Sequence, residues 1–337
     1  MFSLLTFYCP TALLPYCPTA LLPQYNLDIA PIGDNYLQGI SQHMASHFPW
    51  MMTPGNHEAD CNYTYQNYKG RFAAQNYTGT NNTNSRSSRW YSYDKGAVHF
   101  ISMDTDAWGF DEVAYILPEQ YAFIEQDLKL VDRTVTPWIV LMGHRPMYCS
   151  SALAYTTNSH LGWPKQTENM ESGTPPPPRY GHGFQALGVD PPVWEGQKRG
   201  ENSVQEVPSC GIDDLIRNGM WKSDGSGDRL YAMEPLMSKY HVNVYLTGHE
   251  HNYERTYPLM NGSYVKSYLK PQGKTVHVLT GAGGAYGKDP FGPAAYFDAF
   301  RSSEWSYSDI FVNQTHFILH QKLATNGSVI DEMVLTQ

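Results

Sequence analysis

Histidines follow apolar runs of strand length at three places in this chain, each close behind a glycine. The segment Gly248-His249-Glu250-His251 comes after the apolar run 242–246. Such a run, bounded by polar residues, predicts a buried strand, and the glycine lets the backbone turn sharply at the strand's end. Imidazole is the commonest protein ligand for transition metals. Two histidines projecting from one strand end therefore predict a metal site.

Two other segments repeat this pattern. The run 50–53 leads into Gly55-Asn56-His57, and the run 138–142 leads into Gly143-His144. The amide oxygen of Asn56 is a neutral, hard ligand that suits a divalent metal. Each segment taken singly also fits a strand-end turn with a hydrogen-bonded histidine. We expect all three strand ends to converge on one rim of a sheet, as a metal site or a catalytic cleft.

The three motifs, in this order, resemble those of the calcineurin-like metallophosphoesterases, and their extended forms are similar to those of the purple acid phosphatases. The likeness runs from about residue 25 to the C-terminus. It implies an α/β (mixed α+β) fold with two packed mixed β-sheets flanked by helices, the four-layer metallophosphoesterase fold. It also implies a dinuclear metal centre, with Fe(III) beside Zn, Fe(II) or Mn(II).

The resemblance also implies roles for single residues. Asn56, His144 and His249 match the ligands of the divalent metal, and His251 matches a ligand of the ferric ion. Tyr25 resembles the ferric-ion tyrosine of animal-type members. His57 resembles the catalytic histidine that contacts the phosphate and helps the leaving group depart.

The carboxylate ligands of that family are not found where its motifs would place them. The first acidic residue is Asp28, so neither Asp-x-Gly nor Gly-Asp precedes Tyr25. Instead an octapeptide, Tyr-Cys-Pro-Thr-Ala-Leu-Leu-Pro, stands at 8–15 and again at 16–23. We interpret residues 1–24 as an atypical N-terminal segment, truncated or mis-assembled, that lacks the first strands. A signal segment is the alternative, although no basic residue precedes the apolar stretch and prolines interrupt it.

A missing carboxylate has a physical consequence for a two-metal site. A bridging aspartate would offset the repulsion between two cations held about 3.5–4 Å apart. Histidines, an amide and a phenolate offset less of that repulsion. We therefore expect this chain to bind two metals poorly and to be weakly active or inactive.

The function implied by the resemblance is that of an acid phosphatase. A hydroxide activated by the two metals would attack the phosphorus of a small phosphate monoester. Three alternatives stay open: a phosphodiesterase or nucleotidase of the superfamily, a catalytically inactive secreted glycoprotein of the same fold, and a structural metal-binding protein.

Composition restricts the class of partner. The chain has 337 residues and a net charge of −9, with a pI of about 5.8, which argues against nucleic acid binding. No apolar run reaches the length of a membrane span. Asn-x-Ser/Thr sequons indicate a secreted protein, or a vacuolar or lysosomal one that uses the secretory route. The six predicted glycosylation sites are Asn62, Asn76, Asn81, Asn261, Asn313 and Asn326.

The five cysteines predict one disulfide. Cys149 follows the His144 motif and Cys210 lies in a loop-rich region, and we predict that they pair beside the site. Cys61 would be free or would pair elsewhere. The alternative is that all three are buried thiols.

The rest of the chain alternates helical and strand patterns, within a catalytic domain expected over residues 25–337. Residues 159–229, rich in proline and glycine, are expected to form a long irregular insert, either a solvated loop or a lid. Helices are predicted at 36–48, from 118 to about 131, and at 230–240. Further strands are predicted at 98–103, 276–280, 317–323 and 329–335, the last two joined by an Asn326-Gly327 hairpin turn.

Overall fold

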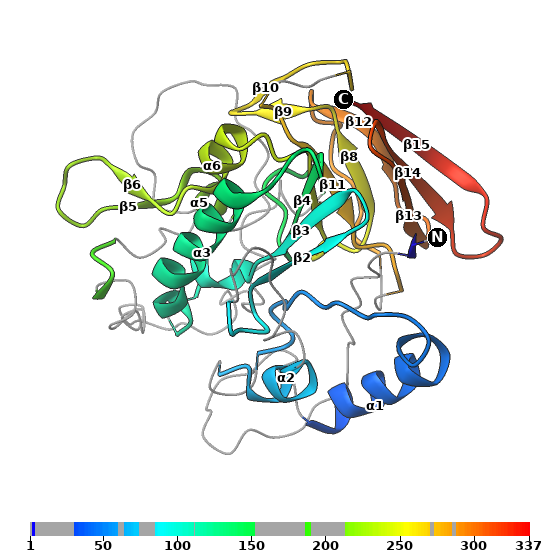
Figure 1. The fold of residues 1–337 in the computed structure, drawn as a ribbon, viewed down its shortest axis with the longest axis horizontal. Helices are drawn as coiled ribbons and strands as arrows, with labels where there is room; N and C mark the ends of the chain where they lie inside the picture. The colour runs from blue at the N-terminus through cyan, green and yellow to red at the C-terminus, as the bar shows by residue number, and fades with distance from the viewer. Residues whose placement is uncertain are drawn as a thin grey trace, which may run out of the picture.

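The computed structural model shows two β-sheets packed against each other, with helices on the outer face of the larger sheet (Figure 1). The described residues are 2–3, 30–59, 64–73, 85–110, 112–151, 186–189, 213–269, 273–284 and 288–337. The predicted α/β class with two packed sheets is therefore confirmed.

The larger sheet has seven strands in the order β12-β8-β11-β7-β4-β3-β2. Strands β3, β4, β7 and β11 run parallel, whereas β2, β8 and β12 pair antiparallel. The four parallel strands are buried along their whole length, because a parallel sheet is covered on both faces. Their sequences are therefore near-continuous apolar runs, and the strands predicted from those runs are confirmed. The bounds are β2 (Tyr91–Lys95), β3 (Val98–Ser102), β4 (Trp138–Met142), β7 (Val244–Thr247), β8 (Tyr253–Thr256), β11 (Val276–Thr280) and β12 (Asp298–Ser302).

The smaller sheet has the order β1-β13-β14-β15. All its pairs are antiparallel, so the expectation of a second mixed sheet is wrong. Short hairpin connections explain two of these pairs, β13–β14 and β14–β15, since hairpins join only antiparallel neighbours. The predicted turn at Asn326-Gly327 is confirmed, with Gly327 at φ +73°. The bounds are β1 (Phe2–Ser3), β13 (Ser306–Val312), β14 (His316–Leu323) and β15 (Val329–Thr336).

An apolar core and one buried ion pair hold the two sheets together. Val140 and Val278 of the larger sheet share a cluster with Phe317 and Leu319 of the smaller one. The ion pair joins Arg255 on β8 to Asp331 on β15, with Nε and Nη2 donating to the two carboxylate oxygens at 2.6 and 2.7 Å. Such two-point pairs are geometrically specific, so this one sets how the sheets meet.

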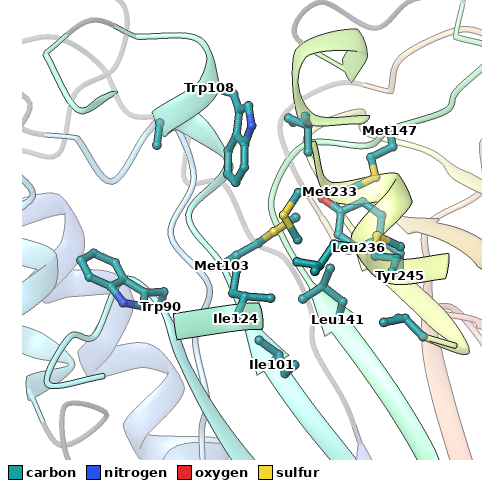
Figure 2. Packing of buried hydrophobic residues seen from close by; sticks show 14 of the residues in the cluster. Trp90, Ile101, Met103, Trp108, Ile124, Leu141, Met147, Met233, Leu236 and Tyr245 are labelled. Atoms are coloured by element: carbon teal, nitrogen blue, oxygen red, sulfur yellow. The ribbon is translucent and has the colours of Figure 1, made fainter. Parts of the chain in front are cut away.

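Helices α3 (Leu117–Leu130), α5 (Asp213–Asn218) and α6 (Met233–Lys239) lie on the other face of the larger sheet (Figure 1). Their buried side chains join one large apolar cluster with the sheet. Figure 2 shows Met103 and Leu141 from strand ends packed near Ile124 of α3 and Leu236 of α6. The helices predicted from 118 and at 230–240 are confirmed as α3 and α6.

The helix predicted at 36–48 lies partly elsewhere. It comprises α1 (Ala30–Ile40) and a π-helical turn η1 (Ser41–Ala45). Phe48 is 65% exposed, so its helical spacing did not reflect burial. Phe48 also precedes Pro49, and a residue before proline disfavours the helical conformation. The helix therefore ends before residue 48.

The strand predicted at 50–53 is absent, since these residues have no strand pairing in the described structure. Side chains anchor the segment instead. The hydroxyls of Tyr68 and Tyr91 donate to the Met52 carbonyl at 2.8 and 2.7 Å. Thr53 bonds to Ser102, at the end of β3, across 2.9 Å. The segment thus reaches the rim of the sheet without being part of it.

The region expected to be an irregular insert is structured in its last part. Residues 213–230 contain α5 and a hairpin of β5 (Met220–Trp221) and β6 (Arg229–Leu230), so the expectation is wrong there. Residues 152–185 and 190–212 lie outside the described part, as do residues 4–29. The domain boundaries at 24 and 25 stay predictions. Among the described helices, none combines the length and apolarity of a membrane span.

Candidate metal centre

His144 and His249 meet because their strands are neighbours. Strands β4 and β7 pair in parallel, which brings their carboxyl ends to one rim. The pairing continues past the strands, as Gly143 N–H donates to the Leu246 carbonyl and Gly248 N–H to the His144 carbonyl. The two imidazole rings lie edge to face, with centroids 4.9 Å apart.

The backbone at His249 is strained. Its φ is +71°, a left-handed value unusual for a residue with a side chain. Glu250 N–H donates to the Gly248 carbonyl at 2.9 Å, closing a three-residue turn around His249. A backbone of this kind costs about 1–3 kcal/mol and persists where surrounding structure holds it. The turn brings the His249 ring against His144.

Asn56 reaches the same place from the anchored segment. A Cβ on Gly55 would lie 2.6 Å from the His144 Nδ1, so only glycine lets the backbone pass this close to the ring. Gly55 N–H donates to the Glu58 carboxylate at 2.8 Å, which tightens the turn. The Asn56 side chain then faces His144.

Three potential ligand atoms converge. His144 Nε2 lies 2.8 Å from Asn56 Oδ1 and 3.0 Å from His249 Nδ1. Asn56 Oδ1 and His144 Nε2 can each offer a lone pair here. Arginine only donates, so His249 Nε2 accepts from Arg145, and Nδ1 carries the proton of the neutral His249 ring. Two donors each about 2.1 Å from one octahedrally coordinated ion, at right angles, would be about 3.0 Å apart. The spacing therefore fits a divalent cation, which would take the place of the proton on His249 Nδ1.

The His144 imidazole is kept neutral. Burial is the main reason that its pKa falls to about 3; Arg145, His57 and His251 lower it further, and Asp106 opposes them. A neutral imidazole has the free lone pair that coordination requires. His57 directly follows Asn56, and His251 lies two residues beyond His249, so both belong to the segments that meet at His144. The predicted residues His57, His144 and His251 are thus brought into one neighbourhood.

Arg145 and Asp106 belong to this neighbourhood, although neither was predicted from the sequence as a site residue. Arg145 Nε donates to Asp106 at 2.8 Å, and its Nη1 lies 3.0 Å from His249 Nε2. Tyr65 donates to the other Asp106 oxygen at 2.8 Å. Burial opposes ionisation of Asp106, but the charge of Arg145 lowers its pKa below the usual range. The available signal was a carboxylate just past the end of β3, a strand for which no ligand was expected.

His251 lies on the other side of the motif, beside Asp289. Its backbone N–H donates to Asp289 Oδ2 at 2.7 Å, and its Nδ1 lies 3.7 Å from the same oxygen. Between the two histidines, Glu250 is fully buried, and burial raises the pKa of its carboxyl to about 8.

The ferric side of the expected centre cannot be assembled from the described residues. Tyr25 lies outside them. Within the described ranges, no three His, Cys, Asp or Glu side chains are grouped to hold a metal ion. The cluster at His144 contains two such side chains and the Asn56 amide.

The cysteine prediction is partly outside the described residues. Cys149 is buried and disulfide-bonded. Cys61 and Cys210 lie outside the described ranges, so the pairing of Cys149 with Cys210 stays a prediction.

Three of the six predicted glycosylation asparagines are described, and all three are exposed and lie in turns: Asn261, Asn313 and Asn326. At Asn313 the side-chain oxygen accepts hydrogen bonds from Thr315 and His316. The amide nitrogen, which is the atom that a glycan modifies, is on the other branch. Asn62, Asn76 and Asn81 lie outside the described residues.

Known families match two parts of the chain. A calcineurin-like phosphoesterase family matches residues 25–176, and a family described as iron/zinc purple acid phosphatase-like protein C matches residues 274–332. The first match contains Asn56 and His144, whereas His249 and His251 lie between the two matches.

Curated relatives and a solved structure agree with these matches. Human acid phosphatase type 7 is 29% identical over 325 residues, covering 92% of this chain and 58% of the relative, so the chain spans little more than half its length. Probable inactive purple acid phosphatase 27 of Arabidopsis thaliana is 25% identical, covering 87% and 38%. The purple acid phosphatase of yellow lupin seeds has a similar fold, with a TM-score of 0.56 at 21% identity over 90% of this chain and 44% of that one. The chain thus contains a calcineurin-like phosphoesterase domain and a purple acid phosphatase-like C-terminal part, and it is homologous to acid phosphatase type 7 and to the purple acid phosphatases.

Proposed function

We propose that this chain is an acid phosphatase that hydrolyses small phosphate monoesters at a dinuclear metal centre. The observation that carries the proposal is the position of His144 Nε2, which lies 2.8 Å from Asn56 Oδ1 and 3.0 Å from His249 Nδ1. Relatives named acid phosphatase type 7 support the reaction class.

The residues divide between two metal positions. Asn56, His144 and His249 would hold a divalent ion (Zn, Fe(II) or Mn(II)), and His251 with Tyr25 would hold Fe(III). When bound, such ions supply positive charge that lowers the pKa of a water and neutralises phosphoryl oxygens.

The chain's own groups would perform the remaining work. The neutral His144 has its lone pair ready, and the Arg145–Asp106 pair supports the ring of His249. His57 would stabilise or protonate the leaving oxygen, a task that general acid catalysis assigns to a group beside the scissile bond.

The test uses the purified chain. Metal content and turnover of p-nitrophenyl phosphate would be measured for the wild type and for His57→Ala. We expect the same metal content in both proteins and a turnover at least about 100-fold lower in the variant. Full turnover by His57→Ala would contradict the role of His57. Faster hydrolysis of bis(p-nitrophenyl) phosphate than of the monoester would favour a phosphodiesterase.

A second candidate is a family member without catalysis. Some relatives are named probable inactive purple acid phosphatases. In the described part of the cluster at His144, the ligand atoms come from imidazoles and an amide, and the nearby Asp106 is paired with Arg145 and Tyr65. A purified chain that retains neither metal nor turnover on either ester would support this candidate.

We further propose that the chain passes through the secretory route, to be secreted or delivered to a vacuole or lysosome. The exposed sequons at Asn261, Asn313 and Asn326 support it. A mass shift on treatment with an endoglycosidase would test it, and an unmodified mass would contradict it.

A further inference from the structure

The two histidines of Gly-His-Glu-His have outer neighbours of opposite charge. His249 Nε2 lies 3.0 Å from the guanidinium of Arg145. His251 Nδ1 lies 3.7 Å from the carboxylate of Asp289, within ion-pair distance. His249 therefore lies beside a positive charge, whereas His251 lies beside a carboxylate.

A carboxylate beside one nitrogen of an imidazole has a known effect. It favours the proton on that nitrogen and leaves the lone pair on the other, and it makes the ring a better metal ligand. For His251, Asp289 would favour a proton on Nδ1 and a lone pair on Nε2. Such outer partners typically change metal affinity by about 10–100-fold.

Two hydrogen bonds hold Asp289 beside His251. Its Oδ2 accepts the backbone N–H of His251 at 2.7 Å, so the carboxylate is tied to the residue whose ring it faces. Its carbonyl accepts from Asn252 Nδ2 at 3.3 Å, which fixes the loop to the same motif. The adjacent Lys288 pairs with Glu304 at 3.4 Å. Among the described residues, no lysine or arginine forms an ion pair with Asp289.

We propose that Asp289 is a positioning residue that orients His251 as an Nε2 ligand and strengthens its metal position. The proposal rests on the proposed function for the ligand role of His251. It gives that position an outer carboxylate, whereas the outer partner of His249 is a cation.

The experiment compares Asp289→Asn with wild type by calorimetric titration of the metal-free chain with Zn²⁺. The asparagine oxygen can still accept the His251 N–H, so the substitution mainly removes charge. Glu304→Gln is the matched control, because it removes the same charge from a side chain that is 65% exposed and pairs with Lys288. We expect one Zn²⁺ position to weaken 10–100-fold in Asp289→Asn alone, with thermal unfolding of the metal-free protein unchanged.

A second measurement needs no metal. Nitrogen-15 spectra of histidine-labelled, metal-free protein report which ring nitrogen of His251 carries the proton, with the resonance assigned from its loss in His251→Ala. We expect Nδ1 in the wild type and a shift towards Nε2 in Asp289→Asn.

The outcomes separate the two proposals. A wild type that binds no Zn²⁺ overturns the proposed metal centre, and the tautomer spectra then test the orienting role of Asp289 alone. If His251→Ala loses a Zn²⁺ position while Asp289→Asn matches Glu304→Gln, the metal centre stands and the inference about Asp289 is overturned. The same proton position in wild type and Asp289→Asn also overturns it.

Discussion

Two clusters in this chain hold a buried imidazole in different charge states, neutral at His144 and positively charged at His99. His144 faces an amide and a second imidazole, and its pKa falls to about 3. His99, on β3, lies between two carboxylates, 2.7 Å from Asp94 and 2.7 Å from Asp127. Burial alone would lower the pKa of His99, but these carboxylates raise it to about 9. His144 keeps a lone pair to offer, whereas His99 is a cation that ties β3 to α3.

The difference shows what separates a candidate ligand from a structural histidine. Both rings are buried, so burial does not distinguish them. The direct partners do: neutral neighbours leave the imidazole uncharged, while carboxylates on both nitrogens keep both protons bound. The comparison can be tested from either side.

The largest effect is expected from removing a ring of the neutral cluster. His249→Ala should lose more than about 100-fold in Zn²⁺ affinity, because a first ligand matters more than an outer one. Calorimetric titration measures it. His320→Gln is the control, since His320 pairs with Glu332 on the smaller sheet. Equal affinity in His249→Ala and His320→Gln would remove the basis for a metal site at this rim.

The next effect concerns the stability of the cationic cluster. Asp127→Asn leaves the buried His99 with one carboxylate and should lower the free energy of unfolding by about 3 kcal/mol. The Asp127 side chain is 1% exposed, so solvent does not replace the lost charge. Urea unfolding measures the change, and Zn²⁺ affinity should stay at the wild-type value. A variant as stable as the wild type would mean that the pair contributes little to folding.

A pH dependence of stability should follow from His99. Its folded pKa of about 9 lies above the unfolded value of about 6.5, so its contribution is complete below pH 6.5 and is lost as pH rises through 9. Between pH 7 and 9 the loss should be about 2 kcal/mol. Urea unfolding at both pH values measures it. The fall should shrink in Asp127→Asn; an identical fall in the variant would assign it to other groups.

The smallest effect is expected at the outer carboxylate of the same histidine. The Asp94 side chain is 40% exposed, so water screens its attraction to His99. Asp94→Asn should therefore cost no more than about 1 kcal/mol in the free energy of unfolding. A loss as large as that of Asp127→Asn would show that burial does not determine the strength of these pairs.

The sequence predicted the parts of the fold whose burial is continuous. Strands β4 and β11 match their predicted bounds, because a fully buried parallel strand requires an apolar run. The run at 50–53 is also apolar, but it is held by tyrosine hydroxyls, a contact between distant residues that local pattern does not encode.

The candidate site was predictable only in its histidines and amide. Their motifs are local, and they meet because β4 and β7 are neighbours. Asp106 comes from beyond the end of β3 and pairs with Arg145, the residue after His144, and Asp289 comes from a loop nearly forty residues beyond His251. The left-handed φ of His249 also has no sequence signal, since it follows from the turn that packs its ring against His144.

That strained turn has a kinetic consequence. The chain already holds His249 in a costly backbone conformation, so the fold, rather than an arriving ion, supplies the energy that sets the ring in place. An ion entering this position would meet ligands already at coordination spacing and would need only to shed its own water. Metal uptake at His144 and His249 should therefore be limited by exchange of the ion's hydration shell, with little delay from rearrangement of the protein.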